Sequence, residues 1–124
     1  MSKLPMIARL VLGVIFFVFG LNGFLNFLPM PPLNPNAGQF LGALAATGYM
    51  FPIIKFLEVV VGILFLSNKF VPLALILLAP ITVNIVLFHG ILDPAGLAVP
   101  IVVLVLHLFL ANVYKESFKP LLKA

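Results

Sequence analysis

Lys55 and Glu58 interrupt a long apolar stretch, and their types and spacing make them the first candidates for chemistry. They are three residues apart, so they share a face if the stretch is helical. A carboxylate in apolar surroundings can carry a proton or accept hydrogen bonds from a polar ligand, so Glu58 is a candidate catalytic residue. Lys55 is a candidate ligand-binding residue. The alternatives are that it only neutralises Glu58, or that it extends its ammonium to the lipid head groups.

Four further polar residues in the apolar stretches are candidate site residues. We predict a catalytic role for His89 and ligand-binding roles for Asn22, Asn84 and His107. For the amides and for His107, the structural alternative is a hydrogen bond to a neighbouring helix. Two histidines among apolar helices raise the idea of a bis-histidine haem, but their expected depths in a bilayer differ by about 15 Å. No carboxylate and histidine spacing matches a metal site either, so no metal or cofactor is assigned from the residues.

The composition tells which kind of protein must position these residues. Of 124 residues, 64% are apolar, 8% are charged and none is cysteine. A soluble domain this small could not bury so much apolar surface, which excludes a soluble domain, a disordered tail and a nucleic-acid module. The absence of cysteine excludes disulfides, dithiol redox catalysis and thiolate-bound metals. The composition therefore indicates an integral membrane protein with almost no extramembrane mass.

A helix needs about 20 apolar residues to cross a bilayer, and four runs qualify. The predicted spans are residues 6–28, 48–66, 70–92 and 94–114. The segment Ser67-Asn68-Lys69 predicts a turn, and Asp93-Pro94 is typical of an N-cap followed by proline in the first helical position. Pro80 and Pro100 lie inside predicted spans and are expected to kink them.

Between the first two spans, the segment PMPPLNPN is predicted to be non-helical because it contains Pro29, Pro31, Pro32 and Pro35. Residues 37–47 are predicted to form a short interfacial or re-entrant helix that ends at Thr47-Gly48. The predicted fold is therefore all-α: one transmembrane domain over residues 1–124, an integral membrane four-helix bundle with a short interfacial or re-entrant helix between spans 1 and 2.

The tail, residues 115–124, carries an apolar stripe beside a basic one. Two interpretations are open: an interfacial helix on an anionic leaflet, or ordinary basic residues flanking a span. The apolar stripe contains Tyr114, Phe118, Leu121 and Leu122, and the basic stripe contains Lys115, Lys119 and Lys123.

The distribution of the basic residues predicts which side of the membrane each loop and terminus lies on. Six of the seven Lys and Arg fall at the N-terminus, in the Lys69 turn and at the C-terminus. Cytoplasmic loops carry an excess of Lys and Arg, so both termini are predicted to be cytoplasmic in the cell (inner) membrane. Most of the intramembrane polar residues then fall in the outer half, which predicts a polar pocket there.

Three segments, GLNGFLNF, KFLEVVVGILFL and VNIVLFHGILDP, together with their order and the chain length, resemble the DoxX and DoxX-like family of small membrane proteins. The resemblance covers almost the whole chain. It implies a four-helix inner-membrane bundle, and for some relatives a subunit of a quinone-coupled sulfur-oxidising system. It implies no catalytic role for Asn22, Lys55, Glu58, Asn84 or His89.

Three functions remain open. The first is a non-thiol subunit of a membrane redox system that binds a quinone or similar lipophilic ligand in the outer-half pocket and depends on a partner subunit of an oxidoreductase complex. The second is a non-catalytic scaffold or assembly partner, and the third is a small proton-coupled transporter. Whether the protein is an enzyme stays undecided. The expected partners are membrane lipids, such a subunit and further copies of the chain, but not nucleic acid.

Overall fold

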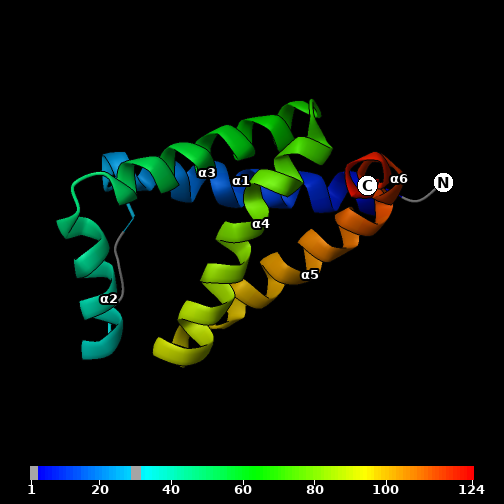
Figure 1. Cartoon of the computed structure of the whole chain (residues 1–124). Helices are drawn as coiled ribbons and strands as arrows, with labels where there is room; N and C mark the ends of the chain where they lie inside the picture. The colour runs from blue at the N-terminus through cyan, green and yellow to red at the C-terminus, as the bar shows by residue number, and fades with distance from the viewer. Residues whose placement is uncertain (1–2, 29–31) are drawn as a thin grey trace.

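The computed structural model describes residues 3–28 and 32–124, and every regular element in these residues is helical (Figure 1). The elements in chain order are α1 (Leu4–Leu25), α2 (Pro35–Ala46), α3 (Met50–Ser67), α4 (Val71–Leu87), the π-helix η1 (Phe88–Leu92), the 3-10 helix η2 (Pro94–Gly96), α5 (Ala98–Val113), α6 (Lys115–Phe118) and the 3-10 helix η3 (Lys119–Leu122). The predicted all-α bundle is confirmed.

Three described segments are long and apolar enough to cross a bilayer: Leu4–Leu25, Met50–Ser67 and Val71–Leu92. A fourth span requires α5 and the short helices after it to be counted together, although they meet at an angle of 76°. The 16 residues of α5 reach only about 24 Å, which is less than the hydrocarbon thickness of a typical bilayer.

The start of the fourth span differs from its prediction. Residues 94–96 form a 3-10 turn and α5 begins only at Ala98. The Asp93 side chain caps no helix, because it pairs instead with His89. Pro100 consequently lies in the first turn of α5, where its missing N–H removes no intrahelical hydrogen bond, so a kink there is not required. Pro80 lies inside α4, as predicted.

The proline-rich segment also contains more helix than predicted. Pro29 and Pro31 lie outside the described residues. Pro35 is helical because Asn34 is an N-cap, whose side chain accepts a hydrogen bond from the Ala37 backbone N–H at 2.9 Å. Proline is favoured directly after such a cap. The break after α2 is as predicted, and Gly48 adopts the left-handed φ of +80° that glycine tolerates best.

Helices α1 and α3 are antiparallel and touch along their lengths. Glycines make this possible: a Cβ on Gly62 of α3 would meet the Phe17 backbone of α1 at 2.6 Å, and one on Gly20 would meet the Val59 backbone at 2.8 Å. At the far end, Arg9 of α1 donates a hydrogen bond to the Phe65 carbonyl at the end of α3. Close backbone approach gives the van der Waals contact that holds helices together in lipid.

The apolar core lies in the half of the molecule that carries both termini, here called the terminal end. Helices α4 and α5 diverge from α1 and α3 toward the opposite end, where α2 runs steeply across the ends of the other helices (Figure 1). The core therefore stops about halfway along the bundle. The buried core residues are Ala8, Leu12, Phe16, Val61, Phe65, Val71, Ala74, Leu75, Leu78, Ile81, Val103 and Leu110.

Candidate functional site

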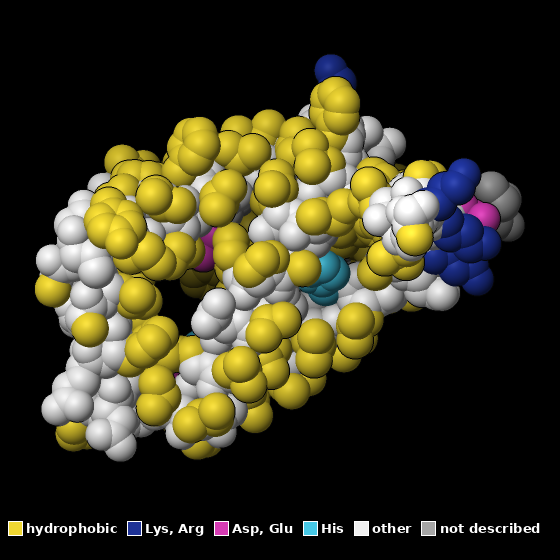
Figure 2. Space-filling model, viewed as in Figure 1, with side chains coloured by type: hydrophobic (Ala, Val, Ile, Leu, Met, Phe, Trp, Pro, Cys, Tyr) yellow, Lys and Arg dark blue, Asp and Glu magenta, His cyan; other side chains and the backbone are white. Residues whose placement is uncertain are grey.

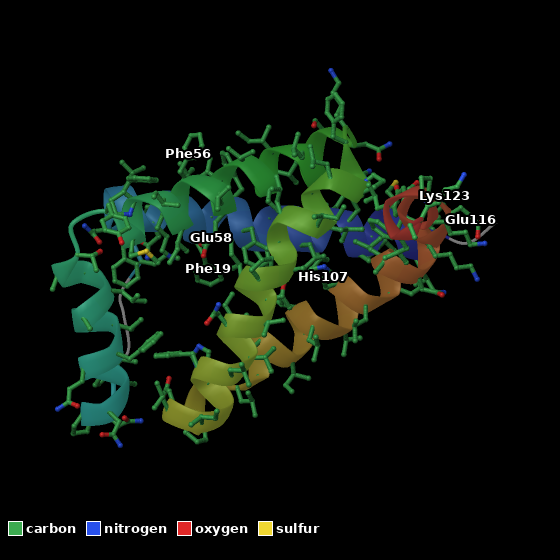
Figure 3. The ribbon with its side chains drawn as sticks, in the orientation of Figure 1. Phe19, Phe56, Glu58, His107, Glu116 and Lys123 are labelled. Atoms are coloured by element: carbon green, nitrogen blue, oxygen red, sulfur yellow. The ribbon has the colours of Figure 1, made fainter. Side chains whose placement is uncertain are left out.

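A hollow lies between α2 and α4, below α1 and α3, in the half of the molecule where the helices diverge. Figure 2 shows this hollow among apolar side chains, with an acidic side chain at its edge. In Figure 3, Glu58 of α3 and Phe19 of α1 lie on the side of their helices that faces the same space, whereas Phe56 points away from it. The hollow is the candidate functional site.

Glu58 is the buried acid of this site. Its side chain is only 7% exposed, and its Oε1 accepts a hydrogen bond from the Lys55 ammonium at 3.3 Å. The helical spacing of three residues brings the two together on one face of α3, as predicted from the sequence. The ammonium compensates the carboxylate, so a charge that would be costly alone in apolar surroundings is paired.

The glycines of α1 position this pair. A Cβ at Gly20 would lie 3.0 Å from the Glu58 Cβ, and a Cβ at Gly23 would collide with the methylenes of Lys55. The Lys55 stem therefore lies against α1 where Gly23 has no side chain. This contact keeps the stem along the helix and leaves its ammonium beside Glu58.

Asn84 reaches the hollow from α4. It lines a cavity of about 200 Å³ between α2 and the end of α4, and its side-chain amide donates a hydrogen bond to the Pro80 carbonyl at 3.1 Å. The other lining residues are Phe40, Leu87, Phe88, Ile91 and Leu92. Neither Lys55 nor Glu58 lines this cavity, so the structure does not bring Asn84 into contact with the Lys55–Glu58 pair.

Asn22 has a structural role in this arrangement. Its Oδ1 accepts a hydrogen bond from the Leu28 backbone N–H at 2.7 Å, while its backbone carbonyl accepts one from Asn26, which has a left-handed φ of 51°. The side chain therefore accepts a hydrogen bond from a backbone N–H just beyond the end of α1. This contact uses one of the two lone pairs of the amide oxygen.

His107 of α5 forms a hydrogen bond with α4. Its Nδ1 lies 2.9 Å from the Thr82 hydroxyl in the buried contact between α4 and α5, and Figure 3 shows it there, away from the hollow. Only 7% of the residue is exposed. The arrangement matches the alternative of an interhelical hydrogen bond.

His89 lies in the turn between α4 and α5. Its Nδ1 is 3.2 Å from the Asp93 carboxylate, and a Cβ on Gly96 would meet the imidazole ring at 2.8 Å. The π-helix η1 places these groups one wide turn apart. The imidazole therefore closes the turn, and the cavity beside Asn84 is lined by its neighbour Phe88 rather than by His89.

Sequence reasoning missed the contacts that close the hollow on its far side. The Asn34 side chain donates a hydrogen bond to the Leu92 carbonyl, and the rings of Phe40 and Phe88 lie 5.6 Å apart. These contacts hold α2 against η1, so α2 borders the hollow. We call α2 in this position the α2 crossbar. The Asn34-Pro35 step is a signal that could have revealed the N-cap, but no local signal points to the Leu92 carbonyl as the second partner of Asn34.

Among the described residues, no three His, Asp or Glu side chains lie close enough together to hold one metal ion. The hollow instead offers an ammonium and a carboxylate in contact at its edge, and the cavity between α2 and the end of α4 adds the Asn84 amide and the rings of Phe40 and Phe88. Such groups can donate hydrogen bonds to a carbonyl and accept one from a hydroxyl, while the apolar walls hold a hydrophobic body.

The apolar spans and their packing define a multi-pass membrane protein. No protein-family model, curated protein or solved structure matches the chain significantly.

Proposed function

We propose that this protein binds a quinone or a similar lipophilic ligand with a polar head in the hollow, and that it serves as a non-thiol, DoxX-like subunit of a membrane redox system. The observation that carries the proposal is the contact between the half-buried Lys55 and the buried Glu58 at the edge of an apolar hollow. An ion pair deep in a membrane segment usually serves a ligand or an ion rather than packing.

The direction of the hollow favours a ligand that arrives from lipid. Figure 2 views α1 and α3 from the side, and the hollow opens toward the viewer. If α1 and α3 cross the bilayer, the hollow faces the acyl chains rather than either aqueous phase. A lipid-soluble molecule can then enter sideways without leaving the hydrocarbon.

The polar groups fit the head of such a ligand. The Lys55 ammonium can donate a hydrogen bond to a quinone carbonyl, and the Glu58 carboxylate can accept one from a hydroquinone hydroxyl. Asn84 offers a further donor or acceptor from α4. The redox role comes from the family resemblance, and a partner subunit supplies the electron carrier.

We further place the protein in the cell (inner) membrane with both termini in the cytoplasm. The support is electrostatic: the basic residues other than Lys55 belong to the ends of α1, α3 and α5 that gather at the terminal end. Basic segments are retained on the cytoplasmic side during insertion. The hollow then lies in the outer half of the membrane.

Equilibrium dialysis of the full chain in lipid nanodiscs with tritiated decylubiquinol, kept reduced so that its hydroxyls can donate to Glu58, tests the proposal. Glu58→Gln keeps the shape but removes the charge, and it is expected to weaken binding about tenfold, the value of one charge-assisted hydrogen bond. Glu116→Gln is the matched control, because Glu116 lies in α6 at the other end and its carboxylate is 70% exposed.

Equal binding by wild type and Glu58→Gln removes Glu58 from the site. If the wild type binds no quinone analogue at all but co-purifies with a stable partner, the scaffold function replaces this proposal. Substrate-driven proton movement in vesicles that Glu58→Gln abolishes replaces it with transport.

A further inference from the structure

The C-terminal foot, which we define as α6 and η3 (residues 115–122), lies apart from the hollow and has no part in the proposed function. It is inclined 76° to α5. If α5 crosses the bilayer, the foot runs along the membrane surface rather than continuing into water. Its angle is held by Tyr114 and Phe118, which are half-buried and pack against the apolar core.

The foot exposes apolar side chains that the core does not cover. Leu121 is 65% exposed and Leu122 is 84% exposed. They are the last residues of η3 and lie at the terminal end of the molecule, where the span gives way to the membrane surface. Exposed leucines at this level can enter the boundary between head groups and acyl chains.

The foot, together with Lys123 directly after it, concentrates positive charge. Lys115, Lys119 and Lys123 are all exposed, and the one acid of the foot, Glu116, pairs with Lys119 at 2.9 Å. Figure 2 shows the basic side chains gathered at this end beside a single acidic one. Lys3, at the start of α1, is also exposed at this end.

We propose that the C-terminal foot is a docking surface for the head groups of anionic phospholipids in the leaflet at the terminal end. The lysines contact the phosphates, and Leu121 and Leu122 enter the layer just beneath them. Charge complementarity selects anionic over zwitterionic lipid, because each basic residue near such a surface contributes favourable electrostatic energy. The foot thereby anchors α5, whose 16 residues are short for a span.

The test uses the full chain with Ser117→Cys, which is the only cysteine once introduced because the sequence contains none. The cysteine carries an environment-sensitive dye, and the protein is reconstituted in vesicles of phosphatidylcholine alone or mixed with phosphatidylglycerol. Quenching by lipids with a nitroxide near the head group reports contact of the foot with the surface. We expect stronger quenching in the anionic vesicles, and a loss of that difference at high salt.

Two sets of substitutions separate charge from shape. Changing all three lysines to glutamine should abolish the preference for anionic vesicles (Lys115→Gln, Lys119→Gln and Lys123→Gln). Each lysine is expected to contribute about fivefold to the equilibrium constant for binding of the foot to the anionic surface. The same three lysines changed to arginine should keep it. Leu121→Ser with Leu122→Ser retains every charge and should lower quenching in both kinds of vesicle.

Equal quenching of the labelled Ser117→Cys protein in both kinds of vesicle overturns the proposal, as does an unchanged preference for anionic vesicles after the three lysines are changed to glutamine. If the dye stays exposed to water in both, the foot is free for a soluble partner and the lipid surface is not its occupant.

Discussion

The hydrogen bond between Thr82 and His107 shows how single polar residues act in this protein. It joins α4 to α5 in the buried contact between them, at 2.9 Å. The Lys55–Glu58 pair differs, because it lies at the edge of the hollow and is held on one helix. At the scale of residues, polar groups that look alike in the sequence therefore divide into structural and candidate functional ones.

The substitution Thr82→Val tests whether the Thr82–His107 pair stabilises the fold rather than binding a ligand. The substitution removes the hydroxyl but keeps the volume, so we expect the free energy of unfolding to fall by about 1 kcal/mol, as for other interhelical hydrogen bonds in membranes. Titration of the reconstituted protein with dodecyl sulfate measures this change. Val83→Ala, on the exposed face of the same helix, is the control. A loss of quinone binding without loss of stability would instead place the Thr82–His107 pair in the ligand site.

At the scale of elements, the glycines of α1 and α3 set how closely the two helices approach. Gly62→Ala places a methyl group against the Phe17 backbone, which cannot move aside. We expect a loss of about 1–3 kcal/mol in the free energy of unfolding, the usual cost of overpacking. The same dodecyl sulfate titration detects it.

Gly42→Ala in α2 is the matched control. A Cβ there meets nothing within 4 Å, and alanine is the better helix former, so stability should be unchanged or slightly higher. If Gly62→Ala is as stable as the wild type, the two helices are not held at the distance that the structure shows.

The α2 crossbar is the second feature at this scale. Phe40→Cys with Phe88→Cys, linked by a flexible bismaleimide, should hold α2 on η1, since the two rings lie 5.6 Å apart. If the ligand enters past α2, the link slows its uptake, as measured by rapid filtration of labelled quinone. Phe40→Cys alone, treated in the same way, is the control. An unchanged rate with the link in place means that entry does not require α2 to move.

The whole molecule has two unlike ends. The terminal end is packed and basic, and the α2 end is open and carries the hollow. Its surface between the two ends is mainly apolar, which suits lipid rather than water. Orientation in the membrane thus decides on which side the hollow lies.

Single cysteines test this orientation cleanly because the chain has none of its own. Ser67→Cys lies at the end of α3, and Asn36→Cys lies at the start of α2; both positions are exposed. With a membrane-impermeant maleimide applied to intact cells, Asn36→Cys should react at once and Ser67→Cys only after the cells are opened. The reverse pattern would place the termini outside.

The sequence alone determined the class and the outline of the fold. An apolar run long enough to span the bilayer can form all of its backbone hydrogen bonds in lipid only as a helix. The helices and most of their ends therefore followed from the composition and from the proline, glycine and polar residues that interrupt the apolar runs. The Lys55–Glu58 contact also followed, since a spacing of three residues puts two side chains on one helical face whatever surrounds them.

Only the tertiary structure decided which residues of different helices are in contact. His107 pairs with Thr82, which is 25 residues away, and Asn34 reaches Leu92, which is 58 residues away. Such partners depend on how helices cross, and helical periodicity carries no information about the crossing angle or the rotation of one helix against another. For the same reason, the hollow between α2 and α4 came from the divergence of whole helices rather than from any local pattern.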